Sequence, residues 1–471
     1  MKFHIENLGA VHQADIEVKP LTVFVGPNQT GKTWTSYLIG GALSKYNWSK
    51  YRDDYANRET SEDYPPIEDA INQLLEEGST TLDLPRFFEE YGDEYFNDLC
   101  KVFPTWLNKF MGTNKIEFGQ LNVSIELDEV KEKISQAILS REYNLKMGMG
   151  KKGEGILNCS KEGNKPNIYF YTAEDQPVDK ILEKLPKMAI REFIAGNIFM
   201  IIQQSLYLNT YFFPAERATL VPLLSHVKRR KVDKFGEEYH DNGKGKELSK
   251  PINDLLNIFM DALEEGAKSQ REEVIKNNPE LKKYTDLGLL LQKEILSGEI
   301  ELPEAEADNE ILFKYTKERE ITLDMNIVSS MVKDLSSLVI YLLYEASPND
   351  LLIIDEPEMN LHPEAQVKLT EFLAILVNAG INVIITTHTP YIVDHLVNLM
   401  KAATIEDKEG IKDKFYLKRT DAFISQDDVS VYLFGDNTAK SILDEEGFID
   451  WETFSKISAH IADLYFELEG D

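Results

Sequence analysis

The residues with the clearest chemical meaning form a glycine-rich loop near the N-terminus, which fits the pattern G-x-x-x-x-G-K-[ST]. Glycines let the backbone fold so that successive N–H groups point toward a phosphate, and a helix that starts at the loop directs its positive end to the same anion. The pattern predicts that Lys32 reaches the β- and γ-phosphates and that the Thr33 hydroxyl ligates Mg²⁺. The residues expected to hold the phosphates are Gly26, Pro27, Asn28, Gln29, Thr30, Gly31, Lys32, Thr33 and Trp34.

A second group of polar residues follows an apolar run late in the chain. Leu351–Ile354 leads directly into Asp355 and Glu356, and ligands of open α/β sheets bind where strands end. Neighbouring residues of a strand point to opposite faces, so Asp355 is expected to hold Mg²⁺ while Glu356 orients and activates the attacking water. Another apolar strand ends at His388, which could hydrogen-bond to a γ-phosphate. Each feature alone could be structural, but together with the loop they favour a nucleoside triphosphatase.

A parallel sheet is needed to position both groups. The apolar run Leu21–Val25 predicts a buried strand directly before the loop, and Trp34–Ser44 predicts the helix after it. From residue 321 on, helical and strand patterns alternate, which is typical of an α/β core with a mostly parallel sheet. The predicted elements are the helix Val332–Leu343, the strand Leu351–Asp355, the helix Pro363–Ala379 and the strand Val383–Thr387.

The rest of the chain divides by pattern rather than by chemistry. Strand-like pieces such as Ile116–Leu127 and Asn167–Thr172 lie among helical stretches, and the glycine-rich piece Met147–Gly155 predicts a turn or loop. We predict an N-terminal β-lobe with the phosphate loop (1–50), a mixed insertion subdomain (51–205), a core strand with a charged helical segment (206–320) and a C-terminal half of the core (321–471).

Composition limits the function further. The chain has 471 residues, with 51 Lys plus Arg against 81 Asp plus Glu and a formal net charge of −30. Phosphate binding needs clustered cations, so this charge argues against a protein that coats nucleic acid. The compact basic run Lys228–Lys231 could contact a DNA backbone or be a solvated loop.

Cysteines and apolar stretches indicate the compartment. Cys100 and Cys159 are too few for a disulfide framework and have no metal-ligand spacing, which is typical of isolated thiols in a reducing compartment. No apolar stretch reaches the ~20 residues that a membrane-spanning helix needs, and no signal peptide is visible. We therefore expect a cytoplasmic protein that does not enter a membrane.

Taken together, these residues resemble the SMC-like branch of ABC-type ATPases. This branch includes the ATPase half of OLD-family nucleases and the ATPases of anti-phage systems such as PARIS and Septu. The most specific stretch is Ile354–Gln366, with the sequence IDEPEMNLHPEAQ. The resemblance implies a P-loop NTPase core with an antiparallel β-lobe, an ABC-type ATPase head, that carries a long, mostly helical insertion. The residues that carry it are Lys2–Val18, Gly26–Thr33, Tyr211–Arg217, Ser329–Leu338, Ile353–Gln366 and Thr386–Asp394.

The same resemblance implies roles for individual residues. Glu356 would be the catalytic acid–base group and His388 the switch histidine. Ser329 and Ser330 would open the signature helix, which contacts the γ-phosphate bound to the opposite subunit, and Asn360–Pro363 would cross the dimer interface. Two chains, or a higher assembly, would enclose ATP and Mg²⁺ and hydrolyse ATP slowly. After the serines the family usually has glycine, where this chain has Met331.

Nuclease members of this branch carry a Toprim domain after the ATPase core. The segment after His388 contains no glycine-flanked D-x-D strand end, and Asp427-Asp428 predicts a turn before the strand Val429–Phe434. We therefore expect a regulatory ATPase of a bacterial anti-phage defence system that controls a separate effector, such as a Toprim or HNH nuclease.

The alternative is an SMC-like ATP-gated DNA clamp in DNA repair or chromosome maintenance. Such a clamp would need long heptad arms, and the sequence shows no sustained heptad repeat. The amphipathic pattern of Phe454–Leu468 predicts a helix that packs on the core or docks a partner.

Overall fold

The computed structural model describes two compact units of the chain. The sheet unit contains Ile5–Leu38, Leu107–Leu121 and the described residues from Tyr211 on, and the helical unit contains Met1–His4, Ile39–Trp106 and Asn122–Thr210. The described residues are 1–59, 63–149, 154–172, 186–224, 248–302, 311–316, 320–444 and 446–449.

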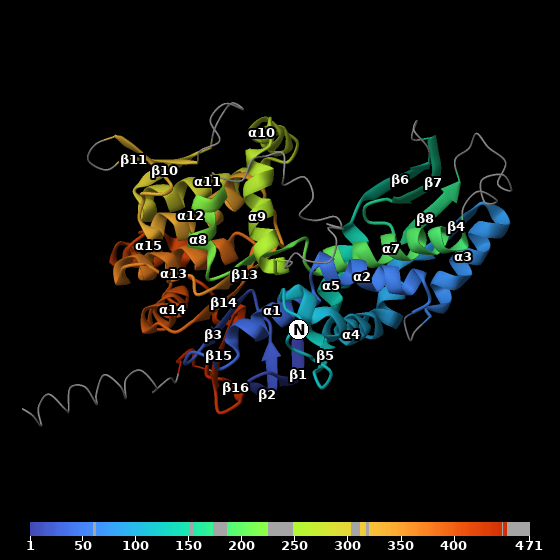
Figure 1. Ribbon diagram of the computed structural model, residues 1–471, viewed down its shortest axis with the longest axis horizontal. Coiled ribbons are helices and arrows are strands. Elements are labelled where there is room, and N and C mark those ends of the chain that lie inside the picture. Colours follow the sequence, from blue (N-terminus) through green and yellow to red (C-terminus); the bar gives the residue numbers. More distant parts are fainter. Residues whose placement is uncertain are drawn as a thin grey trace, which may run out of the picture. The chain divides into compact units, whose positions relative to one another are not determined.

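A large mixed sheet organises the sheet unit (Figure 1). Its strand order is β5-β1-β2-β16-β15-β3-β14-β13-β9, in which β5 and the first residues of β1 belong to the helical unit. The strands are β1 (Lys2–Leu8), β2 (Val11–Glu17), β3 (Leu21–Val25), β5 (Asn122–Glu126), β9 (Thr210–Phe213), β13 (Leu351–Asp355), β14 (Asn382–Thr387), β15 (Val429–Gly435) and β16 (Thr438–Ser441).

The parallel part of this sheet is centred on β3. That strand pairs in parallel with β14 on one side and β15 on the other, and β14 pairs in parallel with β13. All five residues of β3 and all five of β13 are buried, as expected for strands covered on both faces. The predicted strand Leu351–Asp355 matches β13 residue for residue.

Helices cover the parallel strands, and their N-termini follow the capping chemistry of the sequence (Figure 1). Ser329, His362 and Thr389 each accept a backbone N–H bond at a helix start, which satisfies a donor that the helix itself leaves free. The helices are α1 (Lys32–Ala42), α8 (Arg217–Leu224), α9 (Lys250–Leu263), α10 (Ala267–Asn277), α11 (Lys282–Leu291), α12 (Ser330–Tyr344), α13 (Pro363–Asn378), α14 (Pro390–Ala403) and α15 (Lys408–Ile411).

One apolar core joins these helices to the sheet. It includes Val23 of β3, Leu352 of β13, Val339 of α12 and Phe372 of α13. A small antiparallel sheet lies in the same unit and is formed by β10 (Gly298–Glu301), β11 (Leu312–Tyr315) and β12 (Ile321–Asp324).

The described residues of the helical unit form helices and a second sheet of strand order β4-β8-β7-β6. Its core is rich in tyrosine: the rings of Tyr51, Tyr55, Tyr64 and Tyr95 each lie within 6 Å of the Phe199 ring. The elements are α2 (Lys45–Ala56), α3 (Pro65–Glu77), β4 (Ser79–Asp83), α4 (Leu84–Phe110), α5 (Asp128–Ser140), β6 (Tyr143–Met149), β7 (Glu154–Lys161), β8 (Asn167–Thr172) and α7 (Lys187–Leu206).

The predicted fold class, an α/β core on a mostly parallel sheet with a helical insertion, is confirmed. Two local predictions are wrong. The turn or loop predicted for Met147–Gly155 is wrong at both ends, because β6 extends to Met149 and β7 begins at Glu154, and residues 150–153 lie outside the described residues. Ile116–Leu127 is strand only at Asn122–Glu126. The basic run Lys228–Lys231 and the predicted helix Phe454–Leu468 lie outside the described residues.

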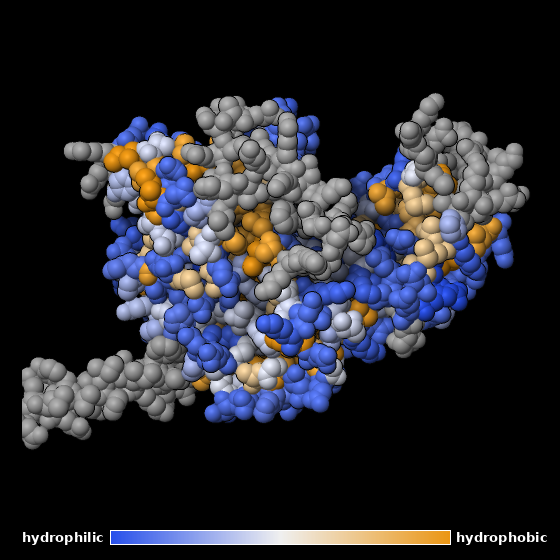
Figure 2. Space-filling model, in the orientation of Figure 1, coloured by the Kyte–Doolittle hydropathy of each residue, from blue (hydrophilic) through white to orange (hydrophobic). Residues whose placement is uncertain are grey.

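The described surface visible in Figure 2 is largely hydrophilic, as the share of charged residues predicts, and the two cysteines are not paired. Figure 2 shows hydrophilic side chains over most of the visible described surface, with apolar side chains in separate groups. Among the described helices, none is long and apolar enough to cross a membrane. Cys100 and Cys159 are free and buried, and burial raises the pKa of each thiol to about 12.

Candidate active site

The phosphate loop connects the end of β3 to the start of α1, as predicted. Gly26 has φ 142° and Gly31 has φ 99°, conformations that L-residues rarely adopt. A Cβ atom on Gly26 would lie 2.4 Å from the backbone oxygen of Phe434. Glycine is therefore needed at Gly26 both for backbone conformation and for the close approach of β15.

Lys32 is buried inside this loop. Its Nζ donates hydrogen bonds to the carbonyl oxygens of Gly26 (2.8 Å) and Pro27 (2.7 Å). Burial lowers the pKa of Lys32, and the nearby charges of Glu356 and Asp355 act in the opposite direction. The ammonium group thus stands at the loop with neutral backbone acceptors, an arrangement that a bound phosphate would complete.

Thr33 and Asp355 meet although they are far apart in sequence. The Thr33 hydroxyl donates to Asp355 Oδ1 at 2.8 Å, and the Thr386 hydroxyl donates to the same oxygen. Burial raises the pKa of Asp355, and the two hydroxyl donors oppose that rise. Hydroxyl and carboxylate oxygens are the ligands that Mg²⁺ takes in nucleotide sites, so this donor set fits a magnesium ion bound with a nucleotide.

Glu356 stands directly after β13 in an unusual backbone conformation. Its φ is 46°, in the left-handed region, and its N–H donates to the carbonyl and to the hydroxyl of Thr386, both at 3.1 Å. The Glu356 carboxylate lies 3.8 Å from Nδ1 of His388. Strained backbone of this kind is concentrated at functional sites, where the surrounding structure enforces it.

A third carboxylate, Glu358, organises the end of β14. Its Oε1 accepts hydrogen bonds from the Thr387 hydroxyl (2.6 Å) and from the His388 N–H (3.0 Å), and lies 3.4 Å from His388 Nδ1. Glu358 is buried, burial raises its pKa, and within the described parts of the chain its Oε2 has no hydrogen-bond partner. Glu358 was not among the predicted site residues, although its place in the same motif as Glu356 was an available signal.

Arg217 is a second residue of the site whose role was not predicted from the sequence. This buried side chain donates to the backbone oxygens of Asp355 (2.7 Å) and Glu356 (2.9 Å). In the sequence, Arg217 stands out only as the last residue of Tyr211–Arg217, one of the stretches that resemble SMC-like ATPases. The residue types of this stretch do not by themselves predict a chemical role for Arg217.

The remaining predicted residues lie at other places in the sheet unit. Ser329 caps α12, and its Oγ accepts from the Val332 N–H at 3.4 Å. Among the residues that the structure describes, no hydrogen bond joins Ser329 or Ser330 to the phosphate loop or to Asp355. Met331 packs partly against the apolar core, and the Trp34 ring packs edge-on against Phe118 with centroids 5.8 Å apart.

Comparisons with known proteins give one family and a set of remote structural likenesses. The model of the AAA ATPase domain family matches residues 1–393. A search of curated proteins finds no match to this sequence. The part of the chain that the family model matches contains the phosphate loop, Asp355 at the end of β13, Glu356 directly after it, and His388.

Three of the similar solved structures are SMC head domains. An SMC head bound to the C-winged-helix domain of ScpA is 11% identical with a TM-score of 0.34, covering 94% of this chain and 96% of that one. The SMC head domain from Thermotoga maritima is 11% identical with a TM-score of 0.29, covering 94% and 97%. An SMC head with an extended coiled coil, bound to a ScpA domain derived from Pyrococcus furiosus, is 12% identical with a TM-score of 0.32, covering 98% of both chains. On the family match, this chain belongs to the AAA ATPase domain family.

Proposed function

We propose that this chain binds ATP with Mg²⁺ and hydrolyses it to ADP and phosphate. The observation that carries the proposal is the 2.8 Å hydrogen bond from Thr33 to Asp355. It joins the phosphate loop to the end of β13, here called the acidic strand because it ends at Asp355 and is followed by Glu356, across 322 residues of sequence. Two expected ligands of one metal ion therefore meet at the loop that would hold the phosphates.

Each residue of the site has a distinct task in this proposal. The loop N–H groups and Lys32 would hold the phosphates, and Thr33 with Asp355 would hold Mg²⁺, which supplies charge neutralisation for the phosphoryl oxygens when bound. Glu356 would orient a water molecule and accept its proton, because its carboxylate follows the metal-site residue and is partly exposed. Glu358 would orient His388 through Nδ1, leaving Nε2 for a hydrogen bond to the γ-phosphate.

We further propose that the chain acts as an ATP-dependent dimer, or a higher assembly of such dimers, in an anti-phage defence system, where it controls a separate effector nuclease. The resemblance of the IDEPEMNLHPEAQ stretch to defence ATPases supports this role. The N-terminus of α12, with Ser329 and Ser330, offers helix N–H groups and a positive dipole end to the γ-phosphate on a second copy. We place the protein in the cytoplasm.

The test uses Glu356→Gln protein, tagged and expressed in its native host. Single-turnover phosphate release should fall about 10³-fold, while ATP affinity stays within threefold, because the amide keeps the shape but cannot accept a proton. Light scattering with ATP should show a stable dimer or a higher assembly of dimers. Pull-down with ATP, followed by mass spectrometry, should recover a stoichiometric nuclease or another toxic effector.

Glu409→Gln, at an exposed surface position, is the matched control and should behave as wild type. Normal hydrolysis by Glu356→Gln would contradict the role given to Glu356. Recovery of DNA or of cohesion and repair proteins alone would replace the defence role by that of a DNA clamp.

A further inference from the structure

A buried arginine connects the acidic strand to the backbone around it. Arg217 is the first residue of α8, and its side chain is 2% exposed. Its Nη1 donates to the carbonyl oxygens of Pro214 (3.2 Å) and Asp355 (2.7 Å), and its Nη2 donates to that of Glu356 (2.9 Å). One guanidinium group thus holds the peptide that carries both acids of the candidate active site.

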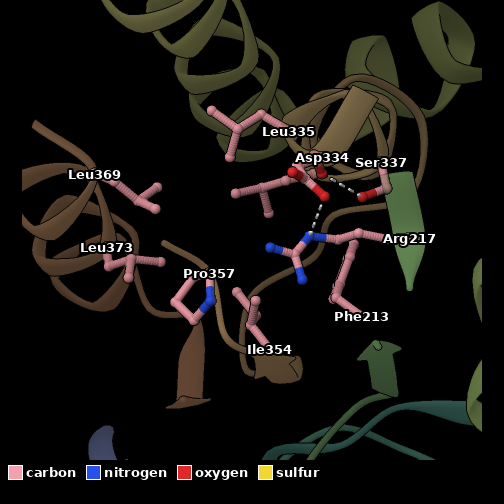
Figure 3. A pocket seen from close by; sticks show the side chains of 10 residues that line it. Phe213, Arg217, Asp334, Leu335, Ser337, Ile354, Pro357, Leu369 and Leu373 are labelled. Carbon is pink, nitrogen blue, oxygen red and sulfur yellow. Dashed lines mark hydrogen bonds and ion pairs between the residues drawn. The ribbon is translucent and has the colours of Figure 1, made fainter. Parts of the chain in front are cut away.

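The same guanidinium faces helix α12. Arg217 Nε lies 3.8 Å from Oδ1 of Asp334, whose side chain is 0% exposed (Figure 3). The other oxygen, Oδ2, accepts a hydrogen bond at 2.8 Å from Asn360, which follows the acidic motif. Asp334 therefore contacts Arg217, which holds the Glu356 carbonyl group, and Asn360, which follows Glu356 in the sequence. Asp334 itself lies on α12, the helix that begins at Ser330.

This contact is incomplete in the structure. Asp334 Oδ1 is buried and, in the described ranges, has no hydrogen-bond partner, while burial raises the pKa of Asp334 and lowers that of Arg217. A small cavity lies beside the ion pair, lined by apolar side chains of α12, β13 and α13 such as Leu335, Ile354 and Leu369 (Figure 3). A shift of α12 by about 1 Å would bring the two atoms to the roughly 2.7–2.9 Å of a charge-assisted hydrogen bond.

We propose that Arg217 is a positioning residue that sets the orientation of Glu356 according to the position of α12. A displacement of α12 moves Asp334, Asp334 moves the guanidinium, and the guanidinium moves the carbonyl groups of Asp355 and Glu356. The planar fork of arginine holds several acceptors in fixed directions, which a lysine ammonium group on a flexible stem does not do. The inference rests on the proposed ATP hydrolysis and names the part of the fold that regulates it.

The experiment compares wild type, Arg217→Lys, Asp334→Asn and the double variant. In Arg217→Lys, kcat should fall about 100-fold, the scale expected when a catalytic group is misplaced by ~1 Å, with the ATP dissociation constant within threefold of wild type. In Asp334→Asn, kcat should fall about 10-fold, and the double variant should match Arg217→Lys because both changes break one connection.

Arg191→Lys is the matched control, because Arg191 is an equally buried arginine of the helical unit. It should lower thermal stability without changing kcat per folded molecule. Unchanged kcat in folded Arg217→Lys, or multiplied losses in the double variant, would overturn the inference.

Hydrogen exchange gives a readout that does not depend on hydrolysis. Asp334→Asn should speed exchange in peptide 353–362 and leave peptide 21–25 unchanged, even though the substitution is on α12. If wild type fails to hydrolyse ATP, the proposed function fails, and the exchange result still decides the inference. Equal exchange in peptide 353–362 of wild type and Asp334→Asn would overturn it.

Discussion

The two units each bury an arginine, and they satisfy it in different ways. In the helical unit, the Arg191 guanidinium hydrogen-bonds directly to Asp63 and Glu68, its Nε donates to the Tyr55 carbonyl oxygen at 2.9 Å, and it lies over the Tyr55 ring. In the sheet unit, Arg217 hydrogen-bonds only to backbone carbonyl oxygens among the described residues, and its nearest carboxylate stays 3.8 Å away.

We interpret Arg191 as a charge that stabilises the fold, and Arg217 as a charge that serves the proposed active site. The carboxylates bonded to Arg191 are partly exposed, so their desolvation is small and their hydrogen bonds are complete. In the sheet unit, the buried carboxylate oxygens Asp334 Oδ1 and Glu358 Oε2 have no hydrogen-bond partner within the described chain. Among its own described residues, the helical unit also leaves the uncharged buried atoms Tyr95 Oη and Gln203 Oε1 without a partner, so the difference lies in the carboxylates. A buried carboxylate oxygen without a partner is expected where a ligand or a movement completes the contacts.

The largest expected effect is a loss of ATP affinity caused by a change in the sheet unit. Lys32→Ala should weaken ATP binding at least 100-fold, or about 3 kcal/mol, because it removes the one ammonium group inside the phosphate loop. Isothermal titration calorimetry with a slowly hydrolysed ATP analogue measures this change. Tight binding by the variant would contradict the loop assignment and with it the functional half of the comparison.

An intermediate effect tests the structural half. Arg191→Met should lower the free energy of unfolding by about 2 kcal/mol, since Asp63 and Glu68 keep access to water at 56% and 22% exposure and are not left as fully buried charges. Urea unfolding gives the loss, and the same preparation should bind ATP as wild type does. A changed ATP affinity would show that Arg191 of the helical unit affects nucleotide binding as well as stability.

The smallest expected effect is an increase, not a decrease, in the free energy of unfolding. Burial raises the pKa of Asp355, so the folded nucleotide-free protein binds a proton that the unfolded chain has released, and its stability falls as pH rises above the ordinary Asp range. Asp355→Asn should therefore stabilise the nucleotide-free protein at pH 7.5, and the gain should shrink as the pH falls toward the ordinary Asp range. Urea unfolding at these pH values measures the gain, and the variant should also lose the Mg²⁺-dependent rise in stability with ATP. Destabilisation by Asp355→Asn at pH 7.5 would contradict this account.

Local patterns explain what the sequence could predict. The strand Leu21–Val25, the loop after it and the strand Leu351–Asp355 were predicted with nearly their observed bounds, because apolar runs and glycines act within a few residues. The meeting of Thr33 with Asp355 was also predictable, since parallel strands bring their C-terminal ends to one edge.

The rest depended on long-range packing. The contact of Arg217 with Asp355 spans 138 residues and uses a backbone oxygen, which no side-chain pattern marks. The hairpin of β6 and β7 was missed because Gly148 and Gly155 indicated a loop, whereas cross-strand pairing includes both glycines in the ladder. The serines of α12 were placed correctly at a helix start, but their action on a second copy stays a prediction.

The neighbours of β3 have a consequence for how the chain is made. The strand that leads into the phosphate loop needs β14 at Asn382–Thr387 and β15 at Val429–Gly435 on its two sides. At roughly 5–20 residues per second, a ribosome delivers these partners only tens of seconds after β3 has left it. The helical unit ends at Thr210 and is synthesised within that interval, so the phosphate loop is synthesised among the first segments and completed among the last.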